Sequence, residues 1–409
     1  MSEVEQKNCC PVVISKDQII PGTEFYDMWN VGSAPDYKAQ VPIFSVYNMH
    51  GLNAIIGYVM LINSNAGKVL YRGQTRLYCG ENGRYNDLLP SFCHLHPVKG
   101  EELKAAKRRW NSEAKANVKS LDKHIEAIIN DPDLLKQIAY NFDSGKEDSK
   151  AELRVVIESM LQHYGSSTRC MDFVDNHWIA LWFGLYQWVS TKNEIGMPVE
   201  CFYKKRTLKL SRKDRLDSVS HIRCQFFNEL KKATSSTSIS ESQSDVNQLI
   251  KNYSYKLAFA EDQYLYLLLF VADTLTEHET TQHSGIYSNS RMTVVDLRRA
   301  LPSVFLRPGA QHGWTVKMNT NKKNMSRGDY SFAKDVVAIL RIPLSLADEL
   351  IGGALLSQEN LFPPADYDQG YRILLQRQEQ AAQKGENLTD LDLAFKAMPI
   401  LKYKSNLTQ

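Results

Sequence analysis

The stretch LQHYGSSTRCMDFVDNHWIALWFGLYQW, residues 161–188, places hydrogen-bonding side chains directly before a strongly aromatic run. These side chains lie close together in the chain: Gln162, His163, Tyr164, Thr168, Arg169 and Asp172. Helix interiors rarely hold so many polar groups unless the groups are solvated or joined in one network. Arg169 and Asp172 can form a buried ion pair that holds the loop against the aromatic segment. The same network can also present His163 and Tyr164 to a ligand.

The sequence around this stretch predicts alternating helices and strands. The segment at 153–165 fits an amphipathic helix that ends near Gly165, since glycine commonly follows a helix end. The segment at 176–190 is apolar almost all round and predicts a buried helix. Short runs rich in β-branched and aromatic residues predict further strands at 41–49, 54–62, 68–79, 197–205, 314–318 and 336–343. A turn at HGLN, 50–53, would join the first two strands, and a helix is predicted at 345–356.

Length and composition limit the class of protein. With 409 residues the chain exceeds a typical domain, and 43% hydrophobic residues can form a sizeable core. The net charge of +3 comes from 49 basic and 46 acidic residues, so local patches matter more than the total. Seven scattered cysteines without a CxxC pair favour a reducing compartment. The sequence shows no signal peptide, and its longest apolar run, 264–272, is too short for a membrane helix. We therefore expect a soluble, cytoplasmic protein without a membrane partner.

Two regions have the character of insertions. Residues 101–130 contain no Gly or Pro and favour one or two solvated helices. Residues 204–232 carry ten Lys and Arg against three Asp and Glu, and the Ser/Thr-rich segment 233–248 that follows predicts a mobile linker. The tail from 376 onward is charged and predicts a surface helix or a frayed end.

Two short motifs resemble ligand-binding loops. Arg72 precedes Gly73, so a guanidinium on a strand could meet a phosphate or carboxylate that the glycine lets approach. The alternative is that Arg72 pairs with an internal carboxylate or faces water. The segment RPGAQHGW, 307–314, brings small residues up to Gln311 and His312, or else forms only a tight turn into a strand. CHLH at 93–96 lacks a second ligand pair, so no metal is expected.

In their order along the chain, these motifs resemble those of the FRG domain family. The matching segments are YRGQ at 71–74, with Tyr in place of Phe, LLPSF at 88–92, QHYGSSTRCMDFVDNHWIALWF at 162–183, QHGW at 311–314 and ENLFPPADYDQGY at 359–371. The resemblance spans roughly residues 66 to 376. It divides the chain into an N-terminal extension (1–40), an FRG domain (41–376) with a helical insert (101–150) and a basic, Ser-rich insert (204–247), and a charged tail (377–409).

The resemblance implies a fold distantly similar to that of ADP-ribosyltransferases. That fold is α+β, with a split, mostly antiparallel sheet that grips NAD and has flanking helices, here with helical and basic insertions. Cleavage of the nicotinamide–ribose bond passes through an oxocarbenium-like cation, so the site must anchor the pyrophosphate and ribose and supply negative potential near C1′.

The resemblance also implies roles for individual residues. Arg72 would hold a phosphate or the ribose with support from Gln74, and His163 and Tyr164 would bind ribose hydroxyls or stack on nicotinamide. Gln311 would lie on the strand where the transferase fold usually places its catalytic Glu. The implied catalytic set is Arg72, His163, Asp172 and Gln311, and the implied NAD-binding set is Arg72, Gln74, His163, Tyr164, Thr168 and Arg169. Because AQHGW contains no carboxylate, Asp172, Glu200 or Glu261 would have to supply one.

The function expected from this resemblance is that of an NAD-dependent ADP-ribosyltransferase, a toxin-like effector of bacterial antiviral defence that uses NAD as substrate. RNA or DNA is the expected acceptor, since a flexible cationic segment with aromatic residues suits a nucleic-acid strand. The candidate contacts are Lys204, Lys205, Arg206, Lys209, Arg212 and Lys213. A solvated loop or a docking site for an acidic protein is the alternative for this segment. For the whole chain, the alternatives are a non-catalytic nucleotide- or nucleic-acid-binding module of a defence or toxin–antitoxin complex, with an antitoxin as partner, and an NAD hydrolase.

Overall fold

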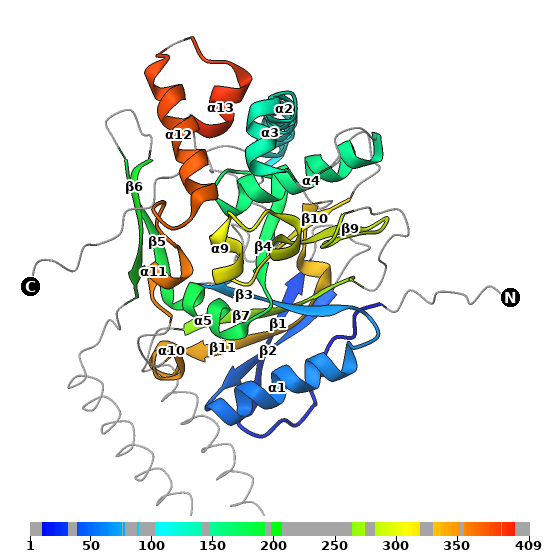
Figure 1. The fold of residues 1–409 in the computed structure, drawn as a ribbon. Coiled ribbons are helices and arrows are strands. Elements are labelled where there is room, and N and C mark those ends of the chain that lie inside the picture. Colours follow the sequence, from blue (N-terminus) through cyan, green and yellow to red (C-terminus); the bar gives the residue numbers. More distant parts are fainter. Residues whose placement is uncertain are drawn as a thin grey trace, which may run out of the picture.

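One large mixed sheet organises the chain (Figure 1). Within the part of the chain that the structure describes, nine strands of this sheet lie in the order β1-β2-β11-β7-β3-β4-β10-β9-β8. Their bounds are Thr23–Val31 (β1), Ala39–Val46 (β2), Lys68–Gln74 (β3), Cys170–Val174 (β4), Tyr264–Ala272 (β7), Ile286–Ser288 (β8), Met292–Asp296 (β9), Gly313–Met318 (β10) and Val336–Pro343 (β11). Neighbouring strands are antiparallel except β2 and β11, which run parallel. The predicted α+β class with a mostly antiparallel sheet and flanking helices is thus confirmed.

The structure is a computed structural model, and it describes residues 10–31, 39–75, 77, 88–89, 103–140, 142, 147–192, 198–206, 264–274, 283–319, 330–351, 356–385 and 387–396. A separate two-stranded sheet pairs β5 (Tyr186–Lys192) with β6 (Pro198–Lys205). None of the helices in these ranges has the length and apolar character needed to cross a membrane.

Helices cover the large sheet (Figure 1). Their bounds are Met49–Ile62 (α1), Leu103–Ile129 (α2), Pro132–Ile138 (α3), Glu147–His163 (α4), His177–Leu185 (α5), Leu297–Ala300 (α8), Leu306–Ala310 (α9), Leu344–Ile351 (α10), Gln358–Leu361 (α11), Gln369–Gln383 (α12) and Asp390–Lys396 (α13), with a 3-10 turn at Ala333–Asp335 (η3). In Figure 1, α2, α3, α12 and α13 gather at the top, while α1 lies along the lower side. Consistent with this, α1 and α5 share one core cluster, and α2, α3, α4, α12 and α13 contribute to another.

The centre of the sheet consists of strands that are hydrophobic on both faces. β7 has the sequence YLYLLLFVA, and its residues from Leu267 to Ala272 are all buried. β11 is similarly buried from Val336 to Ile342. A strand covered on both faces needs apolar residues without alternation, which is the pattern of both segments.

The helix α1 corrects the predicted strand at 54–62 and the predicted turn at 50–53. The side chain of Asn48 caps the helix by accepting a hydrogen bond from the Gly51 N–H at 2.8 Å. Four apolar residues at helical spacing, Leu52, Ile55, Ile56 and Val59, then face the core. The β-branched residues suggested a strand, but the cap and this spacing favour the helix.

The pairing between β3 and β4 is unusually short, and we call this junction of the sheet the seam. The two strands are paired at a single position, Tyr71 with Val174, whereas β3 is paired with β7 along its whole length. The helix α5 packs directly on β3 at Gly73. A Cβ at this position would lie 1.7 Å from the carbonyl oxygen of Ala180, so this close packing requires glycine. The glycine of the YRGQ motif therefore has a structural role in helix packing.

Several predicted boundaries differ from the observed elements. The predicted buried helix at 176–190 ends at Leu185, where β5 begins. The helical insert is not simply solvated, since Ile125 and Ile128 of α2 are fully buried. β1 of the predicted N-terminal extension belongs to the large sheet, and α12 continues across the predicted boundary at 376–377. Phe395 is 1% exposed, so the described part of the tail packs against the core.

Candidate functional site

The end of α4 turns back onto β4 and brings the polar cluster together. Gly165 has a left-handed φ of 99°, and the Ser166 N–H donates to the Leu161 carbonyl at 2.9 Å. The Gly165 N–H donates to the Gln162 carbonyl at 3.0 Å. This is the common glycine-terminated helix end, as the sequence predicts. The reversal places the last turn of α4 beside the first strand residues that follow it.

Asp172 is the centre of the resulting network. Gln162 Nε2 donates to its Oδ2 at 2.7 Å, and His163 Nδ1 lies 3.4 Å from its Oδ1. Arg72 Nη1 donates to the backbone carbonyl of Asp172 at 2.6 Å, across the seam between β3 and β4. The Asp172 side chain is 35% exposed, whereas that of His163 is 4% exposed. The cluster therefore presents mainly one carboxylate to solvent.

Asp172 is held in its ionised form. Burial by itself would raise the pKa of this carboxyl group, but the hydrogen bonds from His163 and Gln162 and the charge of Arg72 hold the pKa below its ordinary 3.8. Thr168 orients the Gln162 amide, since its hydroxyl donates to Gln162 Oε1 at 2.8 Å and accepts from the Cys170 N–H at 3.1 Å. Thr168 is fully buried and acts on the carboxylate only through Gln162.

Arg169 does not pair with Asp172, in contrast to the predicted ion pair. Its Nε and Nη2 donate to Glu158 at 2.8 and 2.7 Å, and its Nη2 also lies 2.9 Å from Asp122. Lys317 Nζ reaches the same Glu158 at 3.0 Å. Extended residues three apart point to opposite faces, so Arg169 and Asp172 separate. Arg169 joins α2, α4 and β4, and no contact to a ligand follows from its position.

Tyr164 is likewise part of the core. It is 1% exposed, and its hydroxyl donates to Asp368 Oδ2 at 3.0 Å. Its ring stacks on Tyr371, and the Arg307 guanidinium lies 4.4 Å from the centres of both rings. Burial raises the pKa of the Tyr164 hydroxyl well above its ordinary value. This packing leaves no surface for the predicted stacking on nicotinamide.

Gln311 is also placed differently from the prediction. It caps the end of α9 and precedes β10, so it does not lie on a strand. It is 4% exposed, and its Nε2 donates to the Leu361 carbonyl at 2.8 Å. The part of QHGW that meets the Asp172 cluster is Gly313, where a Cβ would lie 2.8 Å from His163 Cε1. A side chain at this position would displace the histidine ring.

The remaining predicted residues fall into separate places. Gln74 is 7% exposed on β3 and is paired in register with Tyr266 of β7. Lys204 and Lys205 are exposed on β6, where Lys205 Nζ lies 2.5 Å from Asp348. Arg206 donates to the carbonyls of Gly184 at 3.3 Å and Tyr264 at 3.0 Å, which ties β6 to the core. The other predicted nucleic-acid contacts lie outside the described residues: Lys209, Arg212 and Lys213.

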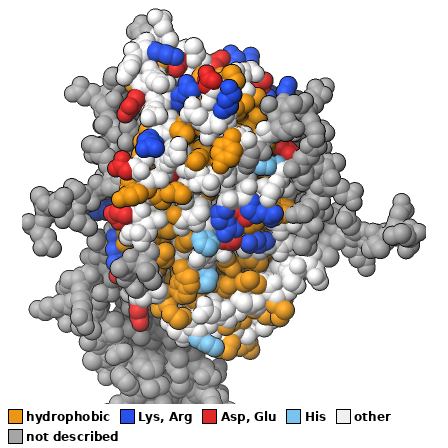
Figure 2. Space-filling view, viewed as in Figure 1, with side chains coloured by type: hydrophobic (Ala, Val, Ile, Leu, Met, Phe, Trp, Pro, Cys, Tyr) orange, Lys and Arg blue, Asp and Glu red, His pale blue; other side chains and the backbone are white. Residues whose placement is uncertain are grey.

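The sequence did not indicate a second ionic cluster, centred on Asp175. Lys68 Nζ, Arg298 Nη2 and His312 Nδ1 lie 2.9, 2.8 and 2.9 Å from its carboxylate oxygens. These partners hold the pKa of Asp175 at about 2 against the effect of burial. His312 has a left-handed φ of 51°, which is uncommon for a residue other than glycine. Figure 2 shows basic and acidic side chains intermixed near the middle of one face, with histidines beside them.

Asp172 is the carboxylate best placed among the three considered from the sequence. Glu200 lies on β6, in the separate two-stranded sheet, and Glu261 lies outside the described residues. The described ranges contain no group of His, Cys, Asp and Glu that could hold a metal ion, and Cys93, His94 and His96 are outside them. The expectation that the protein uses no metal stays a prediction.

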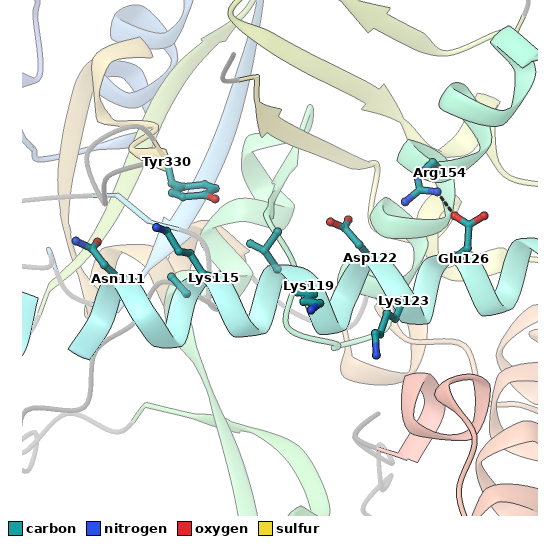
Figure 3. Close-up of a pocket in the computed structure, with 10 residues that line it drawn as sticks. Asn111, Lys115, Lys119, Asp122, Lys123, Glu126, Arg154 and Tyr330 are labelled. Carbon is teal, nitrogen blue, oxygen red and sulfur yellow. Dashed lines mark hydrogen bonds and ion pairs between the residues drawn. The ribbon is translucent and has the colours of Figure 1, made fainter. Parts of the chain in front are cut away.

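A groove of about 500 Å³ lies apart from Asp172, along α2 (Figure 3). Neither Arg72, His163 nor Gln311 lines it. One ion pair connects it to the 161–188 stretch: its lining residue Asp122 lies 2.9 Å from Nη2 of Arg169.

Comparison of the chain with known protein families, curated proteins and solved structures finds no match. The resemblance to FRG domains therefore depends on the quoted motifs and their order.

Proposed function

We propose that this protein is an NAD-dependent ADP-ribosyltransferase in which Asp172 supplies the carboxylate that AQHGW lacks. The observation that supports this most strongly is the arrangement of Asp172. It is partly exposed, ionised at neutral pH, and held by Gln162, His163 and the guanidinium of Arg72. The seam between β3 and β4 is compatible with the split sheet of the transferase fold, because the strands share one pair of residues and Arg72 spans the gap.

The chemistry suits a carboxylate of this kind. The bond between the nicotinamide nitrogen and ribose C1′ breaks, and its electron pair leaves with nicotinamide. Positive charge then develops on C1′ and the ring oxygen, where a nearby carboxylate stabilises it. A nucleophilic oxygen or nitrogen of the acceptor forms the new bond to C1′ and loses its proton to solvent. Asp172 acts electrostatically in this scheme, and Gln162 and His163 position it.

The proposed biological role is that of a toxin-like effector in bacterial antiviral defence, with nucleic acid as the acceptor. This part is supported by the FRG-like motifs in the sequence. An antitoxin or another defence subunit is the partner that such a role would require.

The test is incubation with NAD labelled in its adenylate phosphate, together with total RNA, DNA or protein, followed by separation of each fraction. We expect label in nucleic acid, and a decrease of about 100-fold or more in Asp172→Asn, since loss of one electrostatic stabiliser typically costs a factor of ~10²–10³. Asp17→Asn, at an exposed site, is the matched control and should behave as wild type. If Asp172→Asn is folded and fully active, the proposed role of Asp172 is wrong.

A non-catalytic nucleotide-binding module is the second candidate. The observation in its favour is that two residues of the implied catalytic set, His163 and Gln311, are each about 4% exposed and have little surface for contact with a reacting group. This candidate predicts that ADP-ribose binds, as measured by calorimetry, while NAD remains intact during long incubation. Free ADP-ribose without labelled acceptor would instead identify a hydrolase.

A further inference from the structure

We infer that the groove along α2 binds the phosphate backbone of a single nucleic-acid strand. This surface differs from the basic segment at 204–232, to which the sequence assigned that contact. The inference rests on the proposed function only in identifying the acceptor as nucleic acid, since binding along α2 requires no NAD.

The lining of the groove is basic. Among the described residues, ten line it: Asn111, Ala114, Lys115, Val118, Lys119, Asp122, Lys123, Glu126, Arg154 and Tyr330. Four of these are cationic and two are acidic, which leaves a formal excess of two positive charges. Both acids are already paired, Asp122 with Arg169 and Glu126 with Arg154. The charges of these two carboxylates are therefore offset by arginines, while the lysine residues of the lining are exposed.

The three lysines form a regular row. Lys115, Lys119 and Lys123 follow one another at intervals of four residues on a 27-residue helix, and all three are exposed. Four residues of α-helix rise about 6 Å, so the row repeats its charge along a rigid rod. Like charges at this spacing repel one another and destabilise the helix. A polyanion laid along the helix would remove this repulsion.

The rest of the described lining of the groove is compatible with a nucleic-acid strand, which carries apolar sugars and bases beside its phosphates. Its floor contains Ala114, Val118 and the 5%-exposed Tyr330, which give an apolar base for a sugar or a base edge. Figure 3 shows the Tyr330 ring beside Lys115 at one end and the Arg154–Glu126 pair at the other. The planar fork of arginine imposes a fixed geometry on a carboxylate or a phosphate, whereas lysine acts as a point charge without such a requirement. The row should therefore bind without strong dependence on base sequence.

The experiment measures the binding of fluorescein-labelled 20-nucleotide single strands of RNA and DNA to the full chain without NAD, over a series of salt concentrations. The test variant is Lys115→Gln/Lys119→Gln/Lys123→Gln. The control, Lys16→Gln/Lys136→Gln/Lys150→Gln, removes the same charge from exposed lysines outside the groove. Each phosphate contact on a single strand contributes about 0.7 to the slope of log K against log salt. The test variant should therefore bind at least 10-fold more weakly and lose about 2 from that slope, while the control stays close to wild type.

Three results would overturn the inference: equal weakening in both triple variants, no binding of either strand by the wild type, or binding of polyglutamate in preference to the strands. Circular dichroism establishes that α2 is retained in the test variant. Failure of the proposed function is distinguishable, because it would leave NAD unconsumed while strand binding still depended on the α2 lysines. Conversely, intact strand binding in the test variant, together with NAD turnover that requires Asp172, would contradict only the inference about the groove.

Discussion

Replacing Glu158 with Gln should greatly destabilise the fold, although it changes only one atom. The Glu158 side chain is 1% exposed and accepts four hydrogen bonds, from the N–H, Nε and Nη2 of Arg169 and from Lys317 Nζ, at 2.7–3.1 Å. Each hydrogen bond to a charged group contributes about 1.5–3 kcal/mol. Arg169 keeps Asp122, and Lys317 can reach water, so part of the loss is recovered. Breaking a buried pair from one side leaves an expected cost of about 3–5 kcal/mol in the free energy of unfolding.

The pH dependence of this cost has a definite sign. Burial alone would raise the pKa of Glu158, but Lys317 and Arg169 hold it below its ordinary 4.5. A depressed pKa in the folded state stabilises the protein at pH values above 4.5, and this stabilisation is lost as the pH falls through the folded value. The difference between wild type and Glu158→Gln should therefore be full at pH 7 and shrink below pH 4.5.

Urea unfolding followed by tryptophan fluorescence measures this difference. The matched control is Glu126→Gln, the same substitution at a glutamate that is 49% exposed and pairs with Arg154 on the surface. Surface pairs contribute about 0–1 kcal/mol, so this control should unfold close to wild type. Equal destabilisation by the two substitutions would refute the assignment of Glu158 as the buried ionic centre.

Two further substitutions test the packing and the electrostatics of the sheet. Gly73→Ala should lower the free energy of unfolding by at least about 3 kcal/mol, because the added Cβ would clash with the backbone of Ala180. Gly57→Ala, with open space around the added Cβ, should instead stabilise α1 by about 0.5–1 kcal/mol. Urea unfolding midpoints compare the two variants. Burial raises the pKa of Asp335 from 3.8 to about 6. The folded protein therefore binds this proton more tightly than the unfolded chain, and about 3 kcal/mol of the free energy of unfolding should be lost as the pH rises from 4 through 6. Asp335→Asn should remove this loss, and a constant difference from wild type between pH 4 and 7.5 would contradict it.

Regular strands could be predicted from local sequence, whereas partners in the site could not. The segment at 336–343 is a strand with the predicted bounds, because its apolar run admits few other structures. In α1 the burial of Leu52 and Ile55 follows a helical period, but the neighbouring β-branched residues obscured it.

In the site, Gln162 and His163 contact Asp172 because the chain reverses at Gly165, and the sequence predicts this helix end. The ion pair between Arg169 and Glu158 depends on how α4 packs against β4. No local sequence pattern specifies this packing. The Asp175 cluster was missed for the same reason, since its partners Lys68 and Arg298 come from β3 and α8, distant segments of the chain.

The order of strands in the sheet also affects how the protein is made. β2 and β7 are not neighbours, because β11 lies between them, and β11 is the last of the described strands in chain order. Until residues 336–343 leave the ribosome, the entirely apolar β7 has one unpaired edge, which is the kind of surface that promotes aggregation. The nascent chain should therefore need protection by a chaperone until β11 is synthesised, and products truncated before 336 should be insoluble.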